Sequence, residues 1–388
     1  MKRLLVKLFR MCYPLLCHFI PLDRHCIVFE SNMGNNYTGS PRAIYEAFVA
    51  RGLDEVYSCN IILKQPGGVQ LPGKGKIIKR RSIAYFLTFA RASVWISDSR
   101  MPLYLVKKRG VTYIQTWHGT PLKKLALDMD SVSMAGTTDL ATYKENFRKN
   151  TRTWDYLVSQ NPYSTEIFRR CFDFHKEILE IGYPRCDVLF SKNNPDDIRD
   201  IKTSLGIPLD KRVLLYAPTW RDDSFYGKGH YKFESPLDIA LLQRELGKHC
   251  VLLVKYHYLV ADQIDWSPYE GFVYNFSRAN DIAPLYLIAD AMITDYSSVM
   301  FDYSILNRPM YFFCYDLEKY RDELRGFYFD FEKKAPGPLV TTTRELLNAM
   351  ALESQDLFRE RREAFRETFV SKETGTASDQ IVDLITSL

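Results

Sequence analysis

The sequence has 388 residues and a formal net charge of +5, with apolar and charged fractions of 46% and 26%. This length is typical of two domains, and this composition excludes an extensively disordered chain. The small positive charge fits an anionic substrate or a membrane surface, and no motif of a nucleic-acid-binding protein accompanies it.

The eight cysteines are scattered, and no two of them form a Cys-x-x-Cys pair. Several lie in apolar runs that are typical of strands, where cysteine behaves as a small buried side chain. This usage favours a reducing compartment and gives no sign of a structural zinc site.

Residues 1–24 begin with basic side chains and continue into an apolar run, Met11–Ile20, that Pro14 and His18 interrupt. The run is shorter than the roughly 18 apolar residues that a membrane-spanning helix needs. No small-residue cleavage site follows it, as it would in a secretory signal. The segment is therefore predicted to lie at a membrane interface or, alternatively, to pack on the core as a helix.

In the first half, short β-branched and aromatic runs alternate with segments of helical periodicity. The expected strands are His25–Glu30, Tyr57–Leu63, Lys76–Lys79, Val94–Asp98, Val111–Thr116, Asp155–Ser159 and Ile178–Ile181. Helices are expected from Ser40, from Ser82, over Thr138–Thr153 and from Pro162. Repeated β-α order predicts a parallel sheet with helices on both faces.

The polar stretch Lys192–Asp197 is predicted to lie at the domain boundary, because the same pattern starts again after it. The expected strands of the second half are Val213–Ala217, Val251–Lys255, Phe272–Asn275, Ala291–Thr294 and Met310–Cys314. A helical, charged tail follows from Thr342. We therefore expect two α/β domains, at 25–191 and 192–360.

His118 follows the strand Val111–Thr116 and begins the turn His118-Gly119-Thr120-Pro121, with Lys123 and Lys124 close behind. Open α/β sheets bind ligands at the carboxyl ends of their strands. Imidazole transfers protons near neutral pH, and glycine allows a phosphate to approach the backbone. His118 is therefore a candidate general base, although a histidine that merely bonds the backbone at a strand end is the simpler alternative.

Three strand ends of the second half carry polar groups that a phosphate would bind. They are Thr219-Trp220-Arg221-Asp222, Lys255 with His257, and Thr294-Asp295-Tyr296-Ser297-Ser298. The last stretch runs into a predicted helix, whose amino terminus would suit a diphosphate, although Asp295 or Ser297 could simply cap that helix. The cations would add positive charge to the same site.

Asp222 and Asp223 are adjacent and could hold a divalent metal. Two neighbouring aspartates in a loop are usually solvated, so we expect neither a metal site nor a cofactor.

Five stretches together resemble the CDP-glycerol glycerophosphotransferases of teichoic acid synthesis. They are Tyr113–Lys123, Gly182–Arg185, Ala217–Arg221, Ile293–Tyr303 and Arg325–Tyr328. The resemblance covers most of the chain from Phe29 onward. It implies a GT-B fold, in which two Rossmann-like domains face a cleft and carboxyl-terminal helices, here 361–388, pack back on the amino-terminal domain.

The resemblance also implies the chemistry. A hydroxyl of a lipid-linked acceptor, such as an undecaprenyl-diphosphate disaccharide, would attack the β-phosphorus of CDP-glycerol and release CMP. His118 would be the general base. Thr294, Ser297 and Ser298 would hold the diphosphate, with help from Arg221 and His257. Gly119, Thr120, Lys255 and Asp295 complete the expected site.

One departure from the family pattern is visible, because Lys255-Tyr256-His257-Tyr258 lacks the usual proline after the histidine. The chain also lacks the long amino-terminal extension of polymerising members, which favours a priming enzyme that adds one or a few units. Its basic start would bring it to the cytoplasmic face of the cell membrane as a peripheral protein. Ribitol phosphate transfer from CDP-ribitol and a GT-B glycosyltransferase are the alternatives.

Overall fold

The computed structural model describes residues 12–131, 139–219, 225–227, 230–231, 236–256, 264–319 and 326–388. The chain divides into two compact units. Unit 1 comprises residues 1–118, 126–187 and 372–388, and unit 2 comprises residues 119–125 and 188–371. The chain therefore enters unit 2 briefly after His118 and returns to unit 1 at its end.

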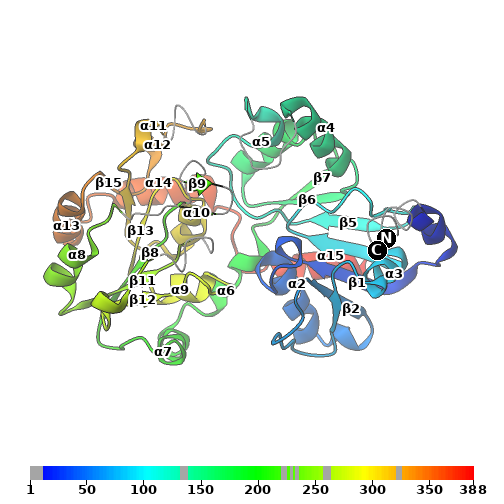
Figure 1. Cartoon of the computed structure of the whole chain (residues 1–388), viewed down its shortest axis with the longest axis horizontal. Helices are drawn as coiled ribbons and strands as arrows, with labels where there is room; N and C mark the ends of the chain where they lie inside the picture. The colour runs from blue at the N-terminus through cyan, green and yellow to red at the C-terminus, as the bar shows by residue number, and fades with distance from the viewer. Residues whose placement is uncertain are drawn as a thin grey trace. The chain divides into compact units, whose positions relative to one another are not determined.

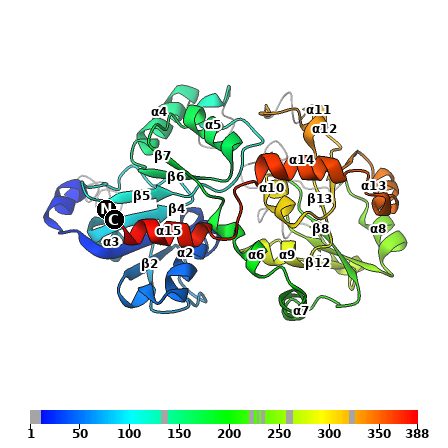
Figure 2. The ribbon, with the colours of Figure 1, turned by 180° about the vertical axis from the view of Figure 1, so that it is seen from behind.

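Unit 1 is built on a parallel sheet of seven strands in the order β3-β2-β1-β4-β5-β6-β7. The strands are β1 (Asp23–Glu30), β2 (Ser58–Leu63), β3 (Lys76–Lys79), β4 (Ala92–Ser97), β5 (Thr112–Gln115), β6 (Tyr156–Ser159) and β7 (Glu177–Glu180). The central strands are almost wholly buried, because helices cover both faces of the sheet (Figures 1 and 2).

The helices of unit 1 include α2 (Gly39–Ala50), α3 (Ile83–Arg91), α4 (Leu140–Thr151), α5 (Pro162–Cys171) and α15 (Ala377–Thr386), and residues 12–19 before β1 are helical as well. Several start where the sequence predicts. The Ser82 hydroxyl caps α3 by accepting from Tyr85 N, and Asn161 caps α5 just before Pro162. The carboxyl-terminal helix α15 packs against α2, where Asp383 pairs with Arg51 at 2.7 Å.

Unit 2 repeats this architecture with a parallel sheet of six strands in the order β12-β11-β8-β13-β14-β15. The strands are β8 (Arg212–Tyr216), β11 (Cys250–Val254), β12 (Val273–Asn275), β13 (Ala291–Thr294), β14 (Met310–Phe313) and β15 (Leu339–Val340). A separate antiparallel pair joins β9 (Phe225–Gly227) to β10 (His230–Tyr231). The two α/β domains and the GT-B fold class predicted from the sequence are thus confirmed.

The helices of unit 2 are α6 (Val188–Ser191), α7 (Pro195–Ser204), α8 (Ile239–Leu246), α9 (Ala283–Ile288), α10 (Val299–Tyr303), α11 (Leu317–Lys319), α12 (Phe331–Lys334), α13 (Thr343–Ala351) and α14 (Arg359–Phe369). Helix α7 starts inside the polar stretch 192–197. Asn194 caps this helix and Pro195 is its first residue, a start signal that the polar composition obscured. Helix α14 belongs to unit 2, where Phe365 stacks on Phe301 at 5.4 Å.

Within the described part of the chain, no helix combines the length and the apolar character that crossing a membrane requires.

Candidate functional site

In both sheets the strand order reverses between two neighbouring central strands. These are β1 and β4 in unit 1, and β8 and β13 in unit 2. Open parallel sheets bind ligands outside the carboxyl ends of the strands at such a reversal. The residues selected from the sequence lie after these strands or after their neighbours. Each unit therefore carries its own group of candidate residues, and the two groups are described in turn.

In unit 1, His118 follows β5 and its side chain is fixed by β4. Its Nδ1 lies 2.8 Å from the backbone oxygen of Asp98. A carbonyl oxygen only accepts hydrogen bonds, so Nδ1 carries the proton and donates it. The neutral ring then presents Nε2 as its basic nitrogen. This is the tautomer and orientation that a general base needs.

The backbone just before His118 is held in an unusual conformation. Trp117 has a left-handed φ of 51°, which is uncommon for a bulky residue, and its N–H donates to the Gln115 side chain at 2.9 Å. The Trp117 ring stacks on the imidazole, with 4.3 Å between ring centroids. Phe172 packs on Trp117 at 4.6 Å. A strained backbone supported on all sides is typical of a functional site.

Asp98 organises the same edge of the sheet through its carboxylate. Its Oδ1 accepts from the backbone N–H of Asn32 and from the Ser99 hydroxyl, each at 2.7 Å. The first of these bonds ties the loop after β1 to the end of β4. Burial raises the pKa of the Asp98 carboxyl, while the hydrogen bond from Ser99 and the charge of His118 act in the opposite direction.

The His118 imidazole has a lowered pKa, although the residue is partly exposed to solvent. The main cause is the crowding of protein atoms around the ring, which desolvates its charged form. The positive charges of Arg185 and Arg100 lower the pKa further, and the hydrogen bond to Asp98 opposes them. At neutral pH the ring is therefore unprotonated and ready to accept a proton.

The continuation of the same motif belongs to unit 2. Gly119 directly follows His118, and a Cβ added to Gly119 would lie 3.5 Å from the Ser298 hydroxyl. Thr120 is buried. Leu122 O accepts from Tyr328 N at 2.8 Å, and Lys124 N donates to Gly326 O at 2.9 Å. Two of the motifs selected from the sequence, 118–124 and 326–328, thus pair as neighbouring extended segments.

Thr294 and Asp295 join β13 to β8 at their carboxyl ends. The buried Thr294 hydroxyl donates to Ala217 O at 2.7 Å, and the Asp295 carboxylate accepts from Thr219 N at 2.8 Å. The Thr294 hydroxyl thus donates within the sheet, and its expected contact with the diphosphate stays a prediction. These two residues shape the strand ends.

Ser297 and Ser298 differ from Thr294 because they point away from the sheet core. Ser297 is half-buried, and Ser298 is exposed at the start of α10 without a side-chain capping bond. Helix α10 has only five residues, so its macrodipole is small. The two hydroxyls and the adjacent backbone N–H groups are the donors that this edge offers to an anion.

Lys255, after β11, is tied to the backbone of its own unit. Its ammonium donates to Ala279 O at 2.8 Å and to Ser277 O at 3.2 Å, and desolvation lowers its pKa. It therefore supports the loop after β12, while the phosphate contact expected from sequence stays a prediction. Arg221, His257 and the Asp222-Asp223 pair lie outside the described residues.

Two cavities of unit 2 lie at opposite ends of its strands. A cavity of about 560 Å³ opens beyond the carboxyl ends of β14 and β15, between Tyr315, Asp316 and Thr341, and its volume suits a small-molecule ligand. Asp316 also accepts from the hydroxyl of Tyr296, the residue between Asp295 and Ser297, at 3.1 Å. This cavity therefore borders the candidate site.

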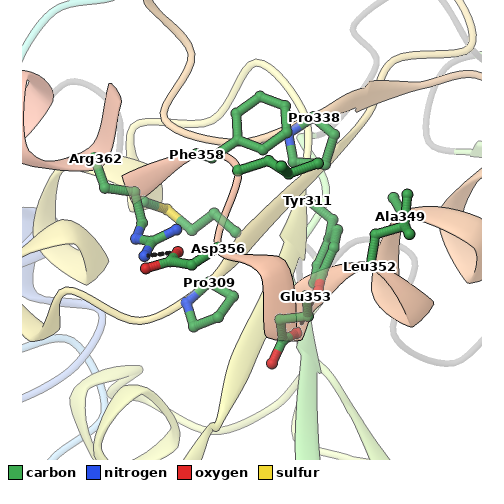
Figure 3. Close-up of a pocket in the computed structure, with 11 residues that line it drawn as sticks. Pro309, Tyr311, Pro338, Ala349, Leu352, Glu353, Asp356, Phe358 and Arg362 are labelled. Atoms are coloured by element: carbon green, nitrogen blue, oxygen red, sulfur yellow. Dashed lines mark hydrogen bonds and ion pairs between the residues drawn. The ribbon is translucent and has the colours of Figure 1, made fainter. Parts of the chain in front are cut away.

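The second cavity, of about 150 Å³, lies where β14 begins (Figure 3). In the close-up, Asp356 and Arg362 form an ion pair, and Glu353 lies next to Tyr311, whose hydroxyl donates to it. Because Pro309 and Met310 line it, this cavity is at the amino end of the strand. It is separate from the candidate site.

Sequence reasoning missed the contributions of Asp98, Trp117 and Arg100 to the His118 half. The stretch Val94–Ser99 does read as a strand that ends in polar residues, but no local pattern says that its carbonyl faces a histidine 20 residues away. The positive φ of Trp117 likewise has no sequence signal, because glycine or asparagine is the usual residue there.

Comparison with known proteins gives consistent matches. The sequence model of the family described as CDP-Glycerol:Poly(glycerophosphate) glycerophosphotransferase matches residues 12–387. A teichoic acid poly(glycerol phosphate) polymerase of Bacillus subtilis is 47% identical over 94% of this chain, which spans about half (49%) of that protein's length. A teichoic acid glycerol-phosphate transferase of Staphylococcus aureus is 42% identical, with 94% of this chain and 93% of that protein covered.

A solved structure agrees. The wall teichoic acid polymerase TagF superposes with a TM-score of 0.91 at 44% identity, over 100% of this chain and 95% of that chain. The two chains therefore share much of their sequence as well as their fold.

Proposed function

We propose that this chain, which belongs to the CDP-glycerol:poly(glycerophosphate) glycerophosphotransferase family, transfers glycerol phosphate from CDP-glycerol to a hydroxyl of a membrane-lipid-linked acceptor. The acceptor is an undecaprenyl-diphosphate disaccharide or its extended form, and the product belongs to teichoic acid or a related cell-wall polymer. The orientation of His118, with Nδ1 bonded to the Asp98 carbonyl and Nε2 left basic, is the observation that carries this proposal.

In the proposed reaction, an acceptor oxygen attacks the β-phosphorus of CDP-glycerol. A new P–O bond forms to the acceptor, and the bond from the β-phosphorus to the bridging oxygen breaks. CMP leaves with the bridging oxygen and its electron pair. Nε2 of His118 takes the proton of the attacking hydroxyl, a role worth about 10²- to 10⁴-fold in rate.

The donor diphosphate is proposed to bind in unit 2, where Ser297 and Ser298 offer hydroxyl and backbone donors. Gly119 supports this, because the absence of a side chain keeps the space beside Ser298 open. The 560 Å³ cavity at the same edge of the sheet offers room for the nucleoside. Arg221 and His257 remain proposed contacts of the phosphates.

The reaction is tested with purified protein, radiolabelled CDP-glycerol and a lipid-linked disaccharide in vesicles. We expect labelled lipid and free CMP, and mass spectrometry of the lipid gives the number of units added. CDP-ribitol and nucleotide sugars serve as competing donors. Turnover of one of these in place of CDP-glycerol would reject the proposed donor.

Replacing Ser298 by alanine is expected to weaken CDP-glycerol binding about 10-fold, because a hydrogen bond to a charged phosphate is lost. Isothermal titration calorimetry measures the dissociation constant. Ser354→Ala, at an exposed position of the same unit, is the matched control and should bind as the unchanged protein does. Equal affinity of the Ser298 and Ser354 variants would remove Ser298 from the donor site.

A membrane-facing surface is proposed on unit 1, where the helix over residues 12–19 packs on α3. Tyr13 donates to Phe86 O at 3.1 Å and their rings are in contact, which joins the two helices side by side (Figure 1). Large apolar side chains nevertheless remain exposed on both helices and on the nearby chain, namely Leu15, Leu16, Phe19, Ile83, Leu87 and Leu103. Such a patch is typical of a membrane-binding face. The basic segment 107–109 lies beside it, because Lys108 Nζ donates to Ile20 O at 2.6 Å.

The double substitution Leu15→Glu/Phe19→Glu is expected to release the protein from anionic vesicles. These side chains are 69% and 85% exposed, so the change leaves the core intact but removes insertion energy of about 1.5–3 kcal/mol per residue. Cosedimentation measures the bound fraction, which should fall at least about 10-fold. Leu209→Glu, at an exposed leucine of unit 2, is the control. Unchanged cosedimentation of the double variant would contradict this surface.

A further inference from the structure

Arg100 is a cation beside His118 that the proposed transfer has not yet used. Its guanidinium lies over the face of Phe147, 4.5 Å from the ring centroid, and 5.5 Å from the centroid of Tyr143. Both rings belong to α4. Among the residues that the structure describes, no carboxylate comes within ion-pair distance of this guanidinium. Its charge is thus held in place by aromatic faces and is not neutralised.

The backbone around Arg100 is fixed on both sides. Ser99 O accepts three hydrogen bonds, from the side chains of Ser97 at 2.9 Å and of Tyr113 and Gln115 at 3.2 Å each. The next residue is anchored as well, because the Asn150 side chain donates to Met101 O. Ordering a long arginine side chain costs conformational entropy. Because the backbone on both sides of Arg100 is already fixed, less entropy is lost when a ligand binds, which favours a binding role.

Arg100 and His118 rest on one aromatic cluster. The imidazole stacks on Trp117, and the Trp117 ring lies 6.5 Å from that of Phe147, which carries the guanidinium on its face. Asp98 and Arg100 are two residues apart on the same fixed turn, one orienting His118 and the other presenting positive charge. The Arg100 charge also reaches the imidazole, because it contributes to the lowered pKa of His118.

We propose that Arg100 binds a phosphate group of the acceptor, so that the attacking hydroxyl is placed at Nε2 of His118. This assignment rests on the proposed function and adds the acceptor's chemical class, a lipid-linked molecule that carries a phosphate group besides the nucleophilic hydroxyl. A planar guanidinium with free N–H donors binds two phosphate oxygens at once. That phosphate comes either from a glycerol phosphate unit already added or from the lipid diphosphate.

The test compares Arg100→Gln, Arg100→Lys and the unchanged protein with CDP-glycerol and two lipid acceptors. One acceptor ends in a glycerol phosphate unit and the other is the same lipid-diphosphate disaccharide without it. We expect Arg100→Gln to raise KM for the first acceptor about 10-fold or more, with KM for CDP-glycerol unchanged. Arg100→Lys should recover part of the loss. An equal rise for both acceptors assigns the contact to the lipid diphosphate.

The matched control is Arg361→Gln, because Arg361 also lies over an aromatic ring, at 5.5 Å from the Phe358 centroid, but in α14 of unit 2. It should change neither KM. A rise only in KM for CDP-glycerol, or unchanged KM values together with a lowered melting temperature, would overturn the proposal and leave Arg100 a donor-site or a structural residue.

A binding measurement separates this inference from the proposed function. Calorimetric titration with a short soluble glycerol phosphate oligomer requires no turnover. We expect the unchanged protein to bind it and Arg100→Gln to bind at least about 10-fold more weakly. If the protein transfers nothing from CDP-glycerol, the proposed function fails. Equal oligomer binding by both proteins, together with an unchanged KM for both lipid acceptors, overturns the role of Arg100.

Discussion

Replacing His118 by alanine is expected to lower kcat for glycerol phosphate transfer by about 10²- to 10⁴-fold. The reason is geometric, because the bond from Nδ1 to the Asp98 carbonyl fixes Nε2 as the proton acceptor. The dissociation constant of CDP-glycerol, measured by calorimetry, should stay within about 2-fold, since the donor contacts proposed for unit 2 remain.

The control for this prediction is His25→Ala, an exposed histidine of β1, which should leave kcat unchanged. The pH dependence of kcat/KM is a second, independent test of His118 as the base. A base works only when unprotonated, and the pKa of His118 is lowered. The acid limb of kcat/KM should therefore lie below pH 6.5, the ordinary histidine value, and should be absent from the residual activity of His118→Ala. Retention of a third of the activity would refute the assignment of His118 as the base.

Replacing Arg80 by methionine is expected to lower the free energy of unfolding by about 3–5 kcal/mol, the largest effect on stability that we predict. Arg80 Nε lies 3.2 Å from the carboxylate of Glu30 at the carboxyl end of β1, and both side chains are almost fully buried. The substitution leaves the Glu30 charge buried without its partner. Denaturant unfolding followed by circular dichroism measures the loss.

Two measurements distinguish a buried unpaired charge from poorer side-chain packing as the cause of the lower free energy of unfolding. The double variant Glu30→Gln/Arg80→Met removes both charges and should recover most of the stability. Burial raises the pKa of Glu30, and the charge of Arg80 opposes that rise. Without Arg80 the folded state holds the Glu30 proton more tightly than the unfolded state does, so stability decreases as pH rises. The deficit of Arg80→Met should therefore be smaller at pH 5 than at pH 8, and a pH-independent deficit would contradict this explanation.

The sequence alone predicts the two parallel α/β units, because strand and helix periodicity and caps such as Ser82 and Asn161 depend on neighbours in the chain. It also places His118 and the stretch Thr294–Ser298 at strand ends, where a doubly wound sheet binds ligands. It predicts no helix at Asn194-Pro195, where α7 begins, because asparagine and proline are as common in turns as at helix starts.

Only the tertiary structure decides which of the polar side chains can meet a ligand. Thr294 and Ser298 look equivalent in the sequence, yet the first gives its proton to Ala217, 77 positions away, and the second stays exposed. Likewise, the pairing of β4 with β5 sets the Asp98 carbonyl against the imidazole of His118. The physical reason is that a hydroxyl or an imidazole satisfies its hydrogen bonds with whatever the sheet brings near, and that partner is fixed by strand order, which local sequence does not encode.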